Sequence, residues 1–160
     1  MNKLRLILGD QLNINHSWFK ENNSKTTYVL MEVKEETSYV LHHAQKIIAT
    51  FAAMRYFAVQ LQQKGFEVIY FKINDKENDQ RFYQNINKII KERNITELQY
   101  LEPDEYRLST ELKKLESIEN IKVESVDTEH FLVPKFYAKD FFSDKKHWRM
   151  EEFYRNMRKK

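Results

Sequence analysis

The chain has 160 residues, of which 41% are hydrophobic and 32% are charged, and its formal net charge is +3. A chain of this length is expected to form one domain, and its apolar content supplies a compact core and argues against disorder. Because there is no cysteine, disulfides, thiolate zinc sites, iron–sulfur clusters and cysteine nucleophiles are excluded within these residues.

Neither a secretory signal nor a membrane-spanning helix is expected. Residues 1–8 form an apolar run that ends too soon for the hydrophobic region of a secretory signal. The longest apolar stretch, residues 47–61, is interrupted by Thr50, Arg55 and Gln60, so it does not suit a transmembrane helix, which needs about 20 apolar residues. We therefore expect a cytoplasmic protein without a membrane partner.

Five short runs of apolar, β-branched or aromatic residues are predicted to be strands. They are residues 4–8, 28–33, 67–71, 97–101 and 122–126. The first three are nearly continuous in apolar character, which is typical of strands in a parallel sheet that is covered on both faces.

Between the strands the hydrophobic period changes to that of a helix. The clearest case is residues 42–64, where one apolar stripe contains Ile47, Phe51, Met54, Ala58 and Leu61. We predict that this helix ends at Gly65 in a left-handed conformation. Further helices are predicted over residues 79–93, closed by Asn94, over residues 104–115 after Pro103, and over residues 144–158.

The alternation of strands and helices predicts a doubly wound, Rossmann-like α/β fold. We expect a five-stranded parallel sheet in the order 3-2-1-4-5 with helices on both faces. We assign residues 1–128 to this domain, and we expect residues 129–160 to form a linker and the first helix of a further carboxyl-terminal domain that is absent from this chain. An aromatic-rich stretch, residues 131–142, lies in that linker.

Polar side chains follow the first two strands, which are neighbours in the predicted sheet, and ligands of doubly wound sheets bind at such carboxyl ends. The grouping consists of Gly9, Asp10 and Gln11, then Glu32, Glu35 and Glu36, and then Tyr39, His43, Lys46 and Thr50. Polar groups above an apolar floor suit a flat polar heterocycle. The alternative is that these residues only cap helices and solvate a rim.

The common catalytic motifs are absent from the sequence, which contains no G-x-G-x-x-G, Walker lysine loop, G-x-S-x-G or H-E-x-x-H. We therefore assign no catalytic residue. His42 and His43 do not indicate a metal site, because adjacent helical residues point about 100° apart and no ligand follows at the required spacing. We expect one of these histidines near the helix start and the other facing the crevice.

Four segments resemble one known family. Residues 6–12 (LILGDQL), 39–47 (YVLHHAQKI), 51–58 (FAAMRYFA) and 150–158 (MEEFYRNMR) are similar to the deoxyribodipyrimidine photolyase-related family, the prokaryotic (6-4) photolyase and cryptochrome branch that carries an iron–sulfur cluster. The resemblance spans essentially the whole chain.

The resemblance implies a role for this chain in a larger flavoprotein. The amino-terminal domain would bind a ribityl-lumazine antenna chromophore. The carboxyl-terminal domain, a partner within the same polypeptide, would hold FAD, the cluster and the damaged DNA. The resemblance, taken with the grouping above, gives the antenna-binding residues as Gly9, Asp10, Gln11, Glu36, Tyr39, His43, Lys46, Ile47 and Thr50. The chain departs from the family pattern at Asp104 and at Tyr106, beside Arg107, and we place these two positions outside the pocket.

Other functions stay open at this point. The domain could be an interaction module without a chromophore, or a small enzyme that acts on nucleotides, although the missing phosphate-binding loop disfavours the latter. Direct DNA binding is expected to be weak and salt-sensitive. It would depend on the basic residues Lys145, Lys146, Arg149, Arg155, Arg158, Lys159 and Lys160.

Overall fold

The computed structural model describes residues 2–134 and 136–159. The chain forms two compact units, Met1–Thr128 and Glu129–Lys160. That the second unit leads into a further domain stays a prediction.

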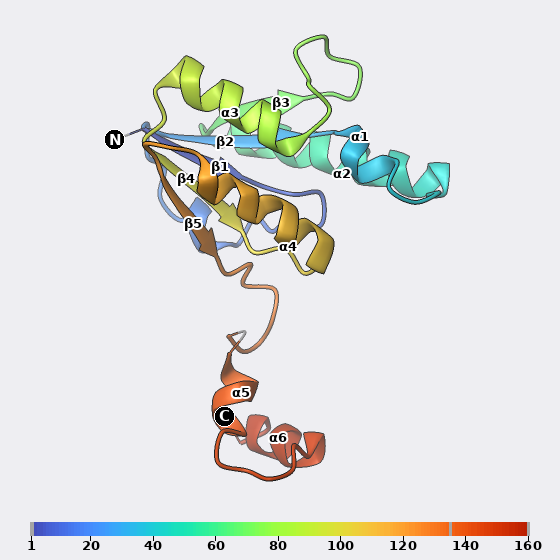
Figure 1. Cartoon of the computed structure of the whole chain (residues 1–160), viewed down its shortest axis with the longest axis vertical. Helices are drawn as coiled ribbons and strands as arrows, with labels where there is room; N and C mark the ends of the chain where they lie inside the picture. The colour runs from blue at the N-terminus through green and yellow to red at the C-terminus, as the bar shows by residue number, and fades with distance from the viewer. Residues whose placement is uncertain (1, 135, 160) are drawn as a thin grey trace. The chain divides into compact units, whose positions relative to one another are not determined.

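The first unit is built on a five-stranded, all-parallel sheet in the order β3-β2-β1-β4-β5 (Figure 1). The strands are β1 (Lys3–Leu6), β2 (Thr26–Met31), β3 (Glu67–Phe71), β4 (Glu97–Leu101) and β5 (Lys122–Val126). The predicted fold class and strand order are confirmed. The first two strands end two residues earlier than predicted, because Leu8 bonds to the following turn and Val33 begins a short helix.

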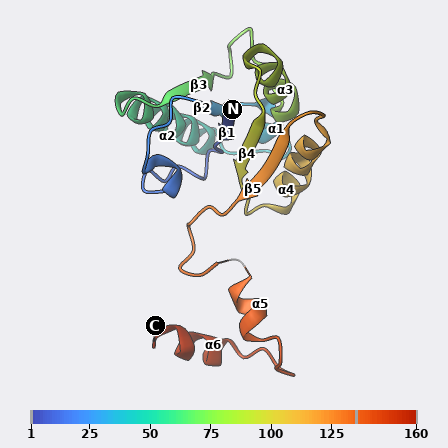
Figure 2. The same ribbon diagram turned by 90° about the vertical axis from the view of Figure 1, so that its left-hand side faces the viewer.

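Helices cover both faces of this sheet, as predicted. They are α1 (Lys34–Thr37), α2 (Ala44–Gln63), α3 (Phe82–Arg93) and α4 (Tyr106–Lys113), with single 3-10 turns at Ser17–Phe19 and Lys114–Ser117. Figure 2 shows α2 on one face and α3 and α4 on the other. Among the described residues, no helix is long and apolar enough to cross a membrane.

Strand β2 shows why the sheet has two cores. All six of its residues are buried. Because side chains alternate along a strand, Val29 and Met31 pack with α3 and α4, whereas Tyr28 and Leu30 pack with α2. Strand β3 lies at the edge of the sheet, and most of its residues are only partly buried despite their apolar sequence.

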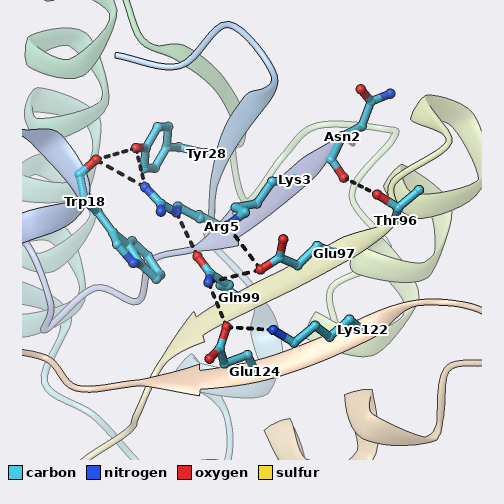
Figure 3. A network of polar contacts seen from close by, with 10 residues as sticks. All are labelled: Asn2, Lys3, Arg5, Trp18, Tyr28, Thr96, Glu97, Gln99, Lys122 and Glu124. Carbon is cyan, nitrogen blue, oxygen red and sulfur yellow. Dashed lines mark hydrogen bonds and ion pairs between the residues drawn. The ribbon is translucent and has the colours of Figure 1, made fainter. Parts of the chain in front are cut away.

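A row of polar side chains crosses four strands on the face that α2 shares. Tyr28, Arg5, Gln99 and Glu124 are register partners of one another along this row (Figure 3). Arg5 donates to the Tyr28 hydroxyl and to Gln99 at 3.0 Å each, and Gln99 donates to Glu124 at 2.9 Å. The hydrogen bonds along this row thus link the polar residues of β1, β4 and β5 to one another and to Tyr28 of β2.

Helix α2 is longer than the strands that it covers. Its 20 residues span about 30 Å, whereas the six residues of β2 span about 20 Å. In the predicted apolar stripe, Met54, Ala58 and Leu61 are buried against the sheet, while Ile47 and Phe51 are half-buried. The first turns of α2 therefore extend past the carboxyl edge of the sheet and leave apolar side chains available there.

The predicted left-handed end of α2 at Gly65 is confirmed, and Asn94 closes α3 as predicted. Gly65 has a φ of +84°, and the Phe66 N–H bonds back to the Leu61 carbonyl oxygen at 3.1 Å. Asn94 closes α3 with a φ of 49°. Both residues redirect the chain into the next strand.

The second unit has a small aromatic core. Helices α5 (Tyr137–Phe141) and α6 (Met150–Met157) surround Phe142, which is 1% exposed. Its ring stacks on Trp148 at 5.3 Å and on Phe153 at 5.9 Å between centroids. The prediction of one helix over residues 144–158 was wrong at its start, because the stacking of Phe142 on Trp148 holds the intervening chain in a loop.

Two of the basic residues assigned to DNA contact form ion pairs inside the second unit. Lys145 pairs with Glu152, and Arg155 pairs with Glu151 at 2.6 Å. These pairs neutralise part of the positive charge of this segment, which agrees with the expectation of weak DNA binding at most. DNA binding itself stays a prediction.

The left-handed end of α2 can be tested by substitution. Gly65→Ala should lower the free energy of unfolding by about 1–2 kcal/mol, because a Cβ atom is strained at this φ. Gly65→Asn is the matched control, since asparagine tolerates the left-handed region, and it should lose less. Urea denaturation of the three proteins measures the difference. An alanine variant as stable as the wild type would contradict this explanation.

Candidate functional site

A pocket of about 230 Å³ lies at the carboxyl ends of the strands of the first unit. Its walls come from the turn after β1, the segment from β2 through α1, the first turns of α2, and the starts of α3 and α4. The floor is apolar and includes Leu8, Val33, Ile47, Met54 and Phe82. The pocket therefore occupies the point where the winding of the sheet reverses, which is where ligands of this fold class bind.

Seven of the nine predicted binding residues line this pocket. They are Gly9, Asp10, Glu36, Tyr39, Lys46, Ile47 and Thr50. The structure thus brings together residues that are up to 41 positions apart in the sequence. Their role in binding a ligand stays a prediction.

Gly9 is required for space next to α2. A Cβ atom at this position would lie 2.9 Å from Thr50 Cγ2 and 3.0 Å from Met54 Sδ. Any larger residue would push the turn after β1 away from the helix. The absence of a side chain at Gly9 therefore lets this turn lie close against α2.

Gln11 lies outside the pocket, contrary to its predicted position. The residue is 2% exposed, and its Oε1 accepts the Leu8 N–H at 3.1 Å. Its Nε2 donates to the Leu101 carbonyl oxygen at 3.2 Å. Because the backbone uses both ends of the amide, the side chain ties the turn after β1 to the end of β4 instead of facing the pocket.

The two adjacent histidines have different roles, and the structure places His42 instead of His43 at the pocket. His43 is the exposed N-cap of α2, and its Nδ1 accepts the Gln45 N–H at 3.2 Å. His42 lines the pocket, and its Nε2 is buried with no hydrogen-bond partner among the described residues. A buried polar atom without a hydrogen-bond partner lowers the free energy of unfolding by about 1–3 kcal/mol. This nitrogen is therefore an exception to the general pairing of buried polar atoms.

Arg107 organises one side of the pocket rim. Its guanidinium donates to Glu36 at 3.0 Å and to Glu105 at 2.8 Å, and it lies 3.8 Å above the centroid of the Tyr39 ring. We call Glu36, Tyr39, Glu105 and Arg107 the rim cluster. The cluster connects the segment after β2 with the start of α4.

The start of α4 therefore also belongs to the site, although Asp104 and Tyr106, which we placed outside the pocket, do not line it. Glu105 and Leu108 line the pocket, and Arg107 holds two residues that do so. The predicted strand order already contained the necessary signal. Since β4 is the other neighbour of β1, the loop that follows it must reach the same crevice.

The rim cluster affects the protonation of Glu36. Burial raises the pKa of the Glu36 carboxyl, and the hydrogen bond and charge of Arg107 offset this only in part. The rim cluster therefore sets a balance between the burial of this carboxyl and its pairing with Arg107.

Glu32 and Glu35 are structural residues outside the pocket, although they belong to the predicted polar grouping. Glu35 accepts the Phe82 N–H at 3.0 Å at the start of α3. Glu32 is fully buried and accepts four hydrogen bonds. Arg55 donates twice, at 2.6 and 2.8 Å, the Tyr70 hydroxyl once at 2.7 Å, and the Ile73 N–H once at 2.9 Å.

These contacts determine the charge state of Glu32. Burial by itself would raise the pKa of this carboxyl, but the hydrogen bonds from Arg55, Tyr70 and Ile73 hold the pKa below its usual value. Glu32 is therefore an ionised, fully satisfied anchor between β2, β3 and α2.

In the part of the chain that the structure describes, no cluster of three or more His, Cys, Asp or Glu side chains could hold a metal ion. The arrangement offers hydrogen-bonding groups, an aromatic ring and an apolar floor. These are features for binding a flat organic molecule.

Comparison with known proteins gives the family of the chain. The family model described as deoxyribodipyrimidine photo-lyase-related protein matches residues 5–160. The chain belongs to this family. A (6-4) photolyase from Agrobacterium fabrum (strain C58 / ATCC 33970) is 35% identical over 161 aligned residues, which cover all of this chain and 32% of that protein. The chain thus spans about a third of the length of this relative, and the resemblance found in the sequence is confirmed.

The Glu32 anchor predicts an acid-sensitive contribution to stability. A carboxyl whose pKa is lowered on folding stabilises the protein above its unfolded pKa of about 4.5, and this stabilisation is lost as the pH falls through the folded pKa. Glu32→Gln should lower the free energy of unfolding at pH 7 by about 1–3 kcal/mol. The difference from wild type should shrink below a pH of about 4.5.

Urea denaturation between pH 3 and pH 7 measures this difference, and Glu21→Gln, at an exposed position, is the control. A difference between Glu32→Gln and wild type that stays constant over this range would show that the anchor does not act through its charge.

Proposed function

We propose that this chain binds a ribityl-lumazine antenna chromophore in a photolyase-like flavoprotein that acts in light-dependent DNA repair or light sensing. In this proposal the remaining two-thirds of the protein carries FAD, an iron–sulfur cluster and the surface for damaged DNA. The observation that carries the proposal is the pocket at the switch point of the sheet, which lies within a chain of the photolyase-related family.

The residues of the pocket fit a chromophore of this kind. A lumazine is a flat heterocycle with polar atoms on its edge, and the pocket offers an apolar floor beneath polar groups from Asp10, Glu36, Thr50 and His42. Lys46 lies at the start of α2, where it can reach the ribityl chain. The unpartnered His42 Nε2 also favours a polar ligand over an apolar one.

The bound chromophore would supply light absorption and pass its excitation to the flavin. The task of this chain is to bind the ring, to fix its orientation and to exclude water from it. No residue of the chain is assigned a catalytic step. The chain by itself is therefore expected to repair no DNA.

Blocking the pocket tests the proposal. The wild-type chain should bind 6,7-dimethyl-8-ribityllumazine saturably, with a change in near-ultraviolet and blue absorption. Thr50→Trp should abolish this change, because the indole would fill space in a pocket of only about 230 Å³. Ile48→Trp is the matched control, since Ile48 lies on the same helix but is 66% exposed.

Thermal melting of each variant verifies that the fold is retained. Binding by the Ile48 variant and by wild type, but not by the Thr50 variant, supports the proposal. If folded wild type shows no saturable binding, or if Thr50→Trp binds as well as wild type, an interaction module without a chromophore becomes the better explanation. Hydrolysis of nucleotides by the purified chain would favour an enzyme instead.

A further inference from the structure

We infer that the solvent-facing side of helix α2 is an interaction surface, and that its partner is a second copy of this chain, packed against it as an antiparallel helix about a two-fold axis. This surface lies on the opposite side of α2 from the sheet, and the inference does not depend on the proposed chromophore. Its six residues, which we call the outer stripe, are Gln45, Ala49, Ala52, Tyr56, Val59 and Gln63.

The first observation is that α2 carries an uncharged stripe on its solvent side in addition to its apolar core side. The residues of the outer stripe are alternately four and three positions apart, so they lie within about 80° of one another around the helix. All six are exposed, and the large side chains of Tyr56 and Val59 are 66% and 47% exposed. A helix without a charged outer side is typical of one that protein covers on both sides.

The other long helices of the first unit differ from α2 in this respect. Helix α3 exposes Lys91 and α4 exposes Lys113, as expected of helices that face water. The exposed charged residues within α2, Lys46 and Arg55, lie on its two flanks, about 80–100° from the centre of the outer stripe. Arg55 is also engaged by Glu32. The lack of charge is therefore specific to the outer stripe.

The order of side-chain sizes along the outer stripe indicates that the partner is a second copy. The small residues Ala49 and Ala52 occupy its amino-terminal half, and the larger Tyr56 and Val59 occupy its carboxyl-terminal half. The positions are symmetric about Met54, so an antiparallel copy with its two-fold axis at this level sets each large side chain opposite a small one. The facing pairs are Ala52 with Tyr56, Ala49 with Val59, and Gln45 with Gln63. An interface between identical surfaces requires such self-complementarity.

Charge and hydrogen bonding agree with this partner. Because the outer stripe is uncharged, two copies meet there without like-charge repulsion, although each chain carries a net charge of +3. The amides of Gln45 and Gln63 can both donate and accept, so each facing pair can form a hydrogen bond across the interface. A nucleic acid would need cations for its phosphates, and the outer stripe offers none.

The size of the contact sets the expected affinity. Helix α2 has 20 residues and is about 30 Å long. A contact made by one helix from each copy is small compared with a standard interface of about 1,600 Å². We therefore expect a reversible dimer with a Kd between about 1 and 100 μM, which sedimentation equilibrium of the 160-residue chain measures.

Insertion of a charge tests the location of the interface. Tyr56→Glu should raise the Kd of the dimer at least about tenfold, because it would bury an unpaired carboxylate opposite Ala52. Tyr83→Glu is the matched control, since Tyr83 is also an exposed tyrosine but belongs to α3 on the other face of the sheet (Figure 2). The control should stay within about twofold of wild type. Circular dichroism and thermal melting verify that both variants keep the fold.

Exchange of two facing residues tests the register. Ala52→Tyr sets two tyrosines against each other and Tyr56→Ala leaves a gap, so each change alone should raise the Kd about fivefold or more. The double variant Ala52→Tyr/Tyr56→Ala sets a tyrosine opposite an alanine again, and it should recover most of the affinity. Non-specific association of an apolar surface would show no such recovery.

Cross-linking tests the direction of the two helices. The chain has no cysteine, so introduced cysteines provide the only thiols. Ala49→Cys/Val59→Cys should form a covalent dimer on oxidation, because facing positions come within the disulfide range of about 7 Å. Ala49→Cys alone should not, because residue 49 of the second copy lies level with residue 59, about 15 Å along the helix axis.

The outcomes decide the inference without involving the pocket. A wild-type chain that stays monomeric at about 300 μM overturns it, and the outer stripe is then left for the remainder of the longer polypeptide. A dimer that Tyr56→Glu leaves intact, or that the exchange does not restore, also overturns it. So does cross-linking of Ala49→Cys alone as efficient as that of the double variant, since the helices are then not antiparallel in this register. Lumazine binding tests the proposed function separately.

Discussion

The buried carboxylate of Glu32 is the interaction on which the arrangement of the site depends. Burying an ionised carboxylate is costly unless its oxygens are fully hydrogen-bonded. Glu32 meets this condition with donors from α2, β3 and the chain after β3. Each donor comes from a different segment, so the carboxylate is satisfied only when all three are in place. The position of α2 over the sheet, and with it one wall of the pocket, follows from this requirement.

Two further connections hold the carboxyl edge of the sheet around the pocket. The Gln11 amide joins the turn after β1 to β4, and Arg107 joins the segment after β2 to the start of α4. Gly9 allows the turn to lie against α2. The pocket is therefore enclosed by packed and hydrogen-bonded groups from separate loops, and such preorganisation suits the proposed binding of a chromophore in one orientation.

The polar row across β2, β1, β4 and β5 joins a buried part of the sheet to a partly exposed edge strand. Tyr28 at one end packs in the core beneath α2, and Glu124 at the other end is partly exposed on β5. Arg5 and Gln99 link the two ends through hydrogen bonds (Figure 3). Because a shift of one residue would turn these side chains to the opposite face, the row also favours the observed strand register.

The sequence by itself determined the fold class, the strand order, the left-handed end of α2 and the family. Hydrophobic periodicity, glycine placement and short family motifs are local properties, and they are preserved whatever the distant parts of the chain do. The order 3-2-1-4-5 also made the region after β1 and β2 the expected site, and most of the residues predicted there line the pocket.

Only the tertiary structure decided which polar side chains face the pocket. The Gln11 amide donates to a carbonyl oxygen 90 positions away, and the Glu32 carboxylate accepts from Arg55 and Tyr70. The His43 imidazole caps the start of α2. Among the described residues, His42 Nε2 has no hydrogen-bond partner, and Arg107 enters the site from the start of α4. The physical reason is that hydrogen-bonding groups in loops have no period, so their direction depends on whichever donor or acceptor the fold brings within reach.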